Sequence, residues 1–218
     1  MKLKKIASLM LAGVMAVSML AGCSGNSNNN SNNNNNQNEN TNTSSMVAAV
    51  NDAQDKIDFT AGASITDALT KVAEVYGTQN ALTVGQIRNY IVKSTGAQAF
   101  EALKNKNTDA DDVDDGDEFT QLYVINVTSR EAYNEGAAMN IAAREVADQI
   151  ANLADTTFVS DEDATRNRPA TENGDDYIDY TYTGEISDMV TVNNVTGRDT
   201  YYVVYTVTQT CAVETFTR

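Results

Sequence analysis

The sequence lacks histidine and tryptophan altogether, and it has one proline and two cysteines among 218 residues. Without histidine the chain cannot build a Ser-His-Asp triad, a Cys-His pair or a histidine metal site of its own. Two cysteines do not supply the four nitrogen and sulfur ligands of an ordinary zinc site. Neither G-x-x-x-x-G-K-[ST] nor G-x-G-x-x-G occurs, so no phosphate-binding loop is indicated. The chain is therefore not expected to be an enzyme of the common hydrolytic or nucleotide-dependent classes.

Positive charge is also scarce, with 15 lysines and arginines against 30 aspartates and glutamates and a net charge of −15. Binding to phosphates needs a density of basic side chains that this chain does not have, so nucleic acid is excluded as an expected partner. An acidic domain is likewise repelled by an anionic membrane surface. Any association with a membrane must then come from something other than surface charge.

The first 22 residues have the three parts of an export signal. A basic start is followed by an apolar run over residues 6–20 and then by small residues. The run is short for a membrane-spanning helix, which needs about twenty apolar residues, and no basic stop sequence follows it. A transmembrane anchor with an incidental cysteine is the alternative, and it fits the pattern less well. The basic residues are Lys2, Lys4 and Lys5.

The end of this segment, LAGC at positions 20–23, resembles the lipobox of bacterial lipoproteins. In that family the cysteine is thioether-linked to a diacylglycerol, and the signal is cleaved just before it. The resemblance implies that residues 1–22 are removed and that Cys23 carries two or three acyl chains of the palmitate type. Such chains hold a protein to a membrane almost permanently. The expected location is the outer face of the bacterial cytoplasmic membrane, or the outer membrane where the host has two.

Residues 24–45 are nearly all asparagine, serine and threonine. A segment without apolar side chains buries too little surface to offset its ordering entropy, so residues 23–45 are expected to be a lipidated cysteine followed by a disordered tether. The remaining cysteine, Cys211, then has no partner for an intramolecular disulfide. Its apolar neighbours predict a buried, unreactive thiol.

Residues 46–218 are expected to form one globular domain of the α+β class. The pattern predicts a helical N-terminal half, followed by a small antiparallel sheet with one long helix packed on one face. Apolar spacing indicates a helix over 64–77, and Thr83 with Gln86 fits a capping box that opens another. Residues 97–106 resume a helical pattern. Thr128 and Glu131 fit a second capping box, which should open the long helix ending near Leu153.

The strands are expected at 119–128, at 177–192 and in a last strand that begins near Thr200. Side chains alternate along the last strand. One set should face the core and pack beneath the long helix, and it consists of Tyr201, Val203, Tyr205, Val207 and Cys211. The other set is predicted to be a solvated or partner-binding surface, and it consists of Tyr202, Thr206, Thr208 and Thr210.

The acidic run NTDADDVDDGDE at 107–118 is the other candidate site. Carboxylate oxygens at this density suit Ca²⁺, although the spacing does not fit an EF-hand loop. A calcium site would use Asp111, Asp112, Asp114, Asp115 and Asp117. The alternative is a solvated acidic loop between a helix and a strand, and no other cofactor is expected.

Together these features predict a membrane-anchored extracytoplasmic lipoprotein that is not catalytic and binds a protein or glycan partner in the cell envelope. The competing hypothesis is a carboxylate-dependent enzyme that acts on glycans, with Ca²⁺ as an assisting ion. Such an enzyme needs two carboxylates across a sugar-binding cleft, and nothing in the sequence singles out that pair.

Overall fold

The computed structural model of the chain describes residues 43–77, 81–96, 99–128, 130–132, 134–159, 169–171, 173–193 and 198–218. All of them fall in one compact unit. The helices and strands follow one another as α2 (Thr43–Ala53), β1 (Phe59–Ala61), α3 (Ala63–Tyr76), α4 (Val84–Thr95), the 3-10 turn η3 (Ala110–Asp112), β2 (Glu118–Thr128), α5 (Glu135–Ile150), β3 (Asp176–Asn193) and β4 (Arg198–Thr215).

The four strands form one sheet in the order β1-β3-β4-β2, which confirms the expected α+β class. The hairpin of β3 and β4 is its centre, and β2 pairs with β4 in antiparallel register along its whole length. The sheet is mixed and not purely antiparallel, because β1 pairs with β3 in parallel. Sequence patterns did not indicate β1, since a strand of three residues has too few positions to show alternation.

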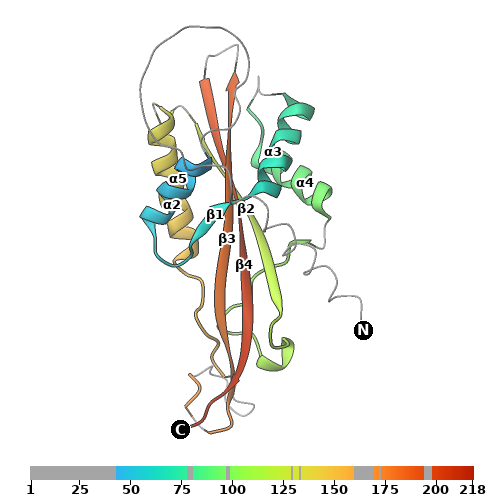
Figure 1. Ribbon diagram of the computed structural model, residues 1–218, viewed down its shortest axis with the longest axis vertical. Helices are drawn as coiled ribbons and strands as arrows, with labels where there is room; N and C mark the ends of the chain where they lie inside the picture. Colours follow the sequence, from blue (N-terminus) through green and yellow to red (C-terminus); the bar gives the residue numbers. More distant parts are fainter. Residues whose placement is uncertain are drawn as a thin grey trace, which may run out of the picture. The chain divides into compact units, whose positions relative to one another are not determined.

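Helices pack on both faces of the sheet. Figure 1 shows α2 and α5 beside one face and α3 and α4 beside the other. Neighbouring residues of β4 point to opposite faces, so Val203 and Tyr205 contact the first helix pair while Tyr202 and Val204 contact the second. The upper half of the β3–β4 hairpin is therefore covered on both sides. Most buried side chains there are apolar or aromatic, with a few buried polar residues such as Ser187 and Asp188 among them.

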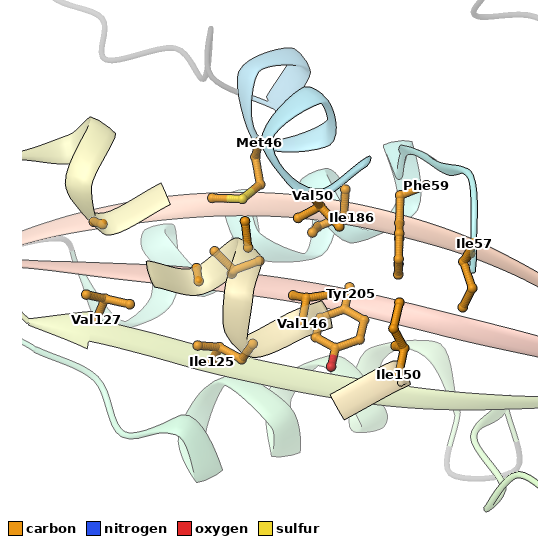
Figure 2. Close-up of a cluster of buried hydrophobic side chains, with 14 of the residues drawn as sticks. Met46, Val50, Ile57, Phe59, Ile125, Val127, Val146, Ile150, Ile186 and Tyr205 are labelled. Atoms are coloured by element: carbon orange, nitrogen blue, oxygen red, sulfur yellow. The ribbon is translucent and has the colours of Figure 1, made fainter. Parts of the chain in front are cut away.

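The larger core lies between the sheet and the helices α2 and α5. Figure 2 shows Met46 and Val50 of α2 pointing into the same space as Val146 and Ile150 of α5. The centre of this core is aromatic. The ring of Tyr205 stacks on Tyr123 at 4.7 Å between centroids, and Phe59 meets Tyr205 edge-on at 5.8 Å. Small residues on α5, including Ala138, Ala142 and Ala143, let the helix approach the strands closely.

Several of the expected helical signals are confirmed. The capping box of Thr83 and Gln86 is present in both directions at the start of α4, with Gln86 N donating to Thr83 Oγ1 at 3.1 Å. The helix expected over 64–77 spans Ala63–Tyr76 and ends at Gly77, which has the positive φ of 73°. The buried face of this helix is formed by Ile65, Ala68, Leu69 and Val72.

Two expected helical signals are wrong. The described part of residues 97–106 is not α-helical, because Glu101 N donates to Thr120 O and the segment runs along the edge of β2. Thr128 and Glu131 do bond to each other, with Thr128 N donating to Glu131 Oε2 at 2.7 Å, but they close a turn. The helix begins later, at Glu135, with Asn134 as its cap. Asn134 therefore caps the helix in place of Thr128.

The lower half of the hairpin is covered on the α5 face by two loops. Gln209 is fully buried there, and its side-chain amide exchanges hydrogen bonds with the backbone of Lys104, at 2.7 and 3.0 Å. The hydroxyl of Tyr180 donates to Asn105 O, and that of Tyr182 donates to Ala154 O. These bonds tie residues 104–105 and 154 to the sheet below α5.

The expected signal peptide, Cys23 and most of the expected tether lie outside the described residues. The last three residues of the segment expected as a tether, 43–45, belong to α2. Within the part of the chain that the structure describes, no helix is long and apolar enough to cross a membrane.

Candidate functional site

On one face of the lower half of the sheet, no helix or loop among the described residues covers the strands. Below α3 and α4, side chains from all four strands point to this side, and none of them is buried. We call these eleven residues the threonine face, because seven of them are threonines. They are Thr60 of β1, Asp179, Thr181, Thr183 and Glu185 of β3, Thr206, Thr208, Thr210 and Ala212 of β4, and Glu118 and Thr120 of β2.

Strand register places the threonines in rows across the sheet. The middle row is Thr183, Thr208 and Thr120, which are direct partners on β3, β4 and β2. The hydroxyls of Thr120 and Thr208 lie 2.9 Å apart and form a hydrogen bond. Neighbouring strands are about 4.8 Å apart, and alternate residues on one strand are about 6.7 Å apart. The face therefore presents a regular array of hydroxyl and methyl groups.

Carboxylates surround the hydroxyl array, and no lysine or arginine occupies any of the eleven positions. Glu118 flanks Thr210 in the row below the middle one, and Asp179 lies one row further down beside Ala212. Glu185 lies beside Thr206 and is half-buried at the foot of α3. Burial raises the pKa of the Glu185 carboxyl above its ordinary value. The threonine face is thus anionic as well as rich in hydroxyls.

Three of the four residues predicted to bind a partner lie on this face. Thr206, Thr208 and Thr210 are partly exposed neighbours along β4. Tyr202 is a correction, because its side chain has 0 % exposure and offers no surface to a partner. The helix α3 and the segment around Leu82 cover it, and its hydroxyl donates to Leu82 O and accepts from Leu82 N, both at 2.7 Å.

Sequence reasoning missed the contributions of the other three strands. The signal was present, since Asp179, Thr181, Thr183 and Glu185 alternate with apolar or aromatic residues along β3. This alternation alone does not define the threonine face, because it does not fix the register between the strands. Register decides which threonines become neighbours, and it is set by the turn and by packing across the whole sheet.

The acidic run does not assemble the predicted calcium site. Among the described residues no three carboxylate or thiolate groups converge as a metal would require. The aspartates hold the loop together instead. Asp117 Oδ2 accepts from Asp114 N at 2.9 Å, and Asp115 Oδ1 accepts from Val213 N at 3.2 Å. Asp111 and Asp112 lie in η3 and are exposed.

The expected burial of Cys211 is confirmed. Its side chain packs with Val113, Ile178 and Tyr180 beneath the acidic loop. Burial, together with the nearby carboxylate of Asp117, raises the pKa of the thiol to about 11. The thiol is therefore protonated at neutral pH and a poor nucleophile.

A small cavity lies beside the upper rim of the threonine face, at the edge of β2. Its volume of about 130 Å³ is below the range of pockets that enclose a small-molecule ligand. Burial raises the pKa of the nearby Tyr123, and the positive charge of Arg88 of α4 offsets part of that rise. The lining residues are Arg88, Phe100, Glu101, Ala102, Gln121 and Leu122.

Comparison with known proteins adds no assignment to this site. No protein-family model matches the chain, and neither a curated protein nor a solved structure matches it.

Proposed function

We propose that this chain is a lipid-anchored lipoprotein of the bacterial cell envelope, and that its folded domain binds a protein or glycan partner through the threonine face. The observation that carries the binding proposal is the uncovered face itself. Among the described residues, the opposite face and the upper half of the same face are packed against helices or loops. The anchoring proposal rests on the sequence LAGC at 20–23 and on the apolar segment before it.

The composition of the threonine face supports a binding surface. Threonine is common in strands, and these short side chains, branched at Cβ and stiff at χ1, lose little rotamer entropy on contact. Each hydroxyl both donates and accepts hydrogen bonds. The tether would hold this face at a distance from the membrane, on its outer side, where envelope proteins and glycans are within reach.

A catalytic role for the perturbed carboxylates finds little support. Burial raises the pKa of Asp188 to about 6 and also raises that of Glu185. These two residues lie on opposite faces of β3, since Asp188 is on the α5 side and Glu185 on the α3 side. They therefore do not form the pair that glycoside hydrolysis needs across one cleft.

Replacing Cys23 by alanine tests the anchor. The variant is expected to accumulate as an unprocessed precursor without acyl label, because the lipid is attached through the thiol. Metabolic labelling with a radioactive fatty acid and the shift in mobility on a gel measure both effects. Cys211→Ala serves as the matched control and should be labelled and processed like the original chain. A Cys23→Ala chain that is still acylated and cleaved would contradict the proposal.

The double variant Thr183→Arg/Thr208→Arg tests the binding face. Two long cations in the middle row should disrupt contact across the face and reduce partner binding by about tenfold or more, with the fold intact by circular dichroism. Formaldehyde cross-linking on intact cells detects a protein partner, and co-sedimentation with purified cell-wall glycan detects a glycan. The control is Ser64→Arg/Thr70→Arg, which changes two exposed positions of α3. Unchanged binding in both assays would contradict the proposal.

A further inference from the structure

The charges on the threonine face distinguish between classes of partner. The face carries three carboxylates, from Glu118, Asp179 and Glu185, and no cation. Glu185 is half-buried, and the cause of its raised pKa is desolvation of the carboxylate. A cationic group placed over it would favour the charged form and offset that desolvation. Charge complementarity therefore points to a basic partner.

The dimensions of the face suit an extended segment of polypeptide. Four strands spaced by about 4.8 Å span roughly 14 Å, and the six steps from Thr206 to Ala212 span roughly 20 Å. That area is well below the roughly 800 Å² that each partner contributes to a standard protein interface. In an extended segment, alternate side chains repeat every 6.7 Å or so, which is the spacing of the rows on this face.

We propose that the partner contacts the threonine face with an extended segment rich in lysine and arginine. This inference rests on the proposed function of the same face and names the chemistry of its partner. Side chains on one side of the segment meet the rows of threonines, whose hydroxyl oxygens accept hydrogen bonds from ammonium and guanidinium groups. The carboxylates of Glu118, Asp179 and Glu185 surround those cations and provide the attraction.

Two other occupants fit the same observations less well. A glycan would find no stacking platform within the threonine face, because none of its eleven positions is aromatic; Tyr177, on the same side of β3, lies beyond Asp179 at the lower end. A second copy of the chain would bring three carboxylates against three carboxylates, and like charges across an interface oppose association.

The test uses the mature, lipidated full chain in micelles of a zwitterionic detergent, and a fluorescent ten-residue peptide of alternating lysine and threonine as the probe. We expect binding that weakens as salt is raised. The variant Glu118→Lys/Asp179→Lys should bind the peptide about tenfold more weakly or worse. The matched control is Asp52→Lys/Asp148→Lys, which changes the net charge equally at exposed positions of α2 and α5. It should change the affinity by less than about twofold.

A second pair of variants separates charge from shape at one position. Thr208→Glu is expected to preserve or strengthen peptide binding, whereas Thr208→Arg, which also places a long side chain there but with the opposite charge, should weaken it by several-fold. Circular dichroism verifies that both variants fold. Equal losses in the face variant and its α2/α5 control would overturn the inference, and so would equal losses from Thr208→Glu and Thr208→Arg.

Failure of this inference can be told apart from failure of the proposed function. Absence of peptide binding, with binding of an N-acetylglucosamine hexasaccharide that Thr208→Arg abolishes, would overturn the basic segment and leave a binding face for glycan. If Thr183→Arg/Thr208→Arg leaves both cellular cross-linking and co-sedimentation with cell-wall glycan unchanged, the binding face itself is overturned.

Discussion

Replacing Asp188 by asparagine is expected to stabilise the fold at pH 7 and to have little effect near pH 4. Asp188 is 7 % exposed, and its Oδ1 has no hydrogen-bond partner among the described residues. Burial raises the pKa of this carboxyl to about 6 from an ordinary value of 3.8, and the negative charge of Glu135 adds to the effect. The charged form is therefore disfavoured in the folded state more than in the unfolded state.

The sign of the pH dependence follows from this difference. At pH 7 the folded protein holds a buried charge that it would lose by protonation, so this group lowers stability by up to about 3 kcal/mol. As the pH falls through about 6 the folded state takes up a proton before the unfolded state does, and stability rises until the unfolded state is also protonated below about 4. Asparagine removes the charge at every pH.

Urea denaturation at pH 7 and near pH 4, followed by circular dichroism, measures the effect of Asp188→Asn. The gain in unfolding free energy should reach about 1–3 kcal/mol at pH 7 and be close to zero at the lower pH. Asp179→Asn is the matched control, since Asp179 is exposed on the same strand, and it should change stability little. A variant that is less stable than the original at both pH values would show that the Asp188 carboxylate makes a favourable interaction in the fold.

Replacing Gly184 by alanine is expected to destabilise the fold by about 3 kcal/mol. A Cβ at this position would lie 2.4 Å from Cε1 of Phe59 and 3.1 Å from Cγ2 of Ile57. Phe59 cannot move aside easily, because its ring is buried and packs edge-on against Tyr205 in the centre of the core. Figure 2 shows Phe59 beside Ile57. The short strand β1, which carries Phe59, should lose its pairing with β3 first.

Denaturation curves measure the loss of stability, and hydrogen exchange at the Gly62 amide, which donates to Ile186 O at 3.0 Å, reports the attachment of β1. Gly85→Ala is the control, because its nearest neighbour to a new Cβ is 3.9 Å away and alanine favours a helix. The double variant Gly184→Ala/Phe59→Leu should recover part of the loss, since the smaller side chain makes room. Additive losses in the double variant would place the destabilisation elsewhere.

The regular elements were predictable from the sequence where a local signal was unopposed. The capping box of Thr83 and Gln86 opens α4, as its spacing indicates. The paired strands at 177–192 and near 200–215 appear as β3 and β4. Both signals act over a few residues, so they predict structure without knowledge of distant contacts.

Prediction failed where a distant partner competed with the local pattern. Residues 99–106 have a helical composition, yet Glu101 and Lys104 bond to Thr120 and Gln209, which are distant in the sequence. Thr128 and Glu131 meet as a capping box should, but the chain turns and α5 starts at the Asn134 cap. Helical propensity is weak, and such bonds easily exceed it.

The candidate site was likewise predictable only in part. Alternation along β4 predicted that Thr206, Thr208 and Thr210 share a face, and the threonine face contains all three. The same alternation placed Tyr202 with them, and that residue is buried. A period of two says which residues share a side of the sheet, but it says nothing about where along the strand a helix covers that side.

The sequence by itself determined the composition of each strand face, the local helix caps and the absence of histidine chemistry, because these depend on residue identity and near spacing. Tertiary structure alone decided which threonines become neighbours, and it placed α3 over Tyr202 while leaving Thr208 uncovered. Tertiary structure also decided that Asp117 accepts a hydrogen bond within the acidic run and that Asp115 accepts one from β4. The physical reason is that register, burial and helix placement depend on contacts between residues far apart in the chain. The free energies of those contacts cannot be read from a short stretch of sequence.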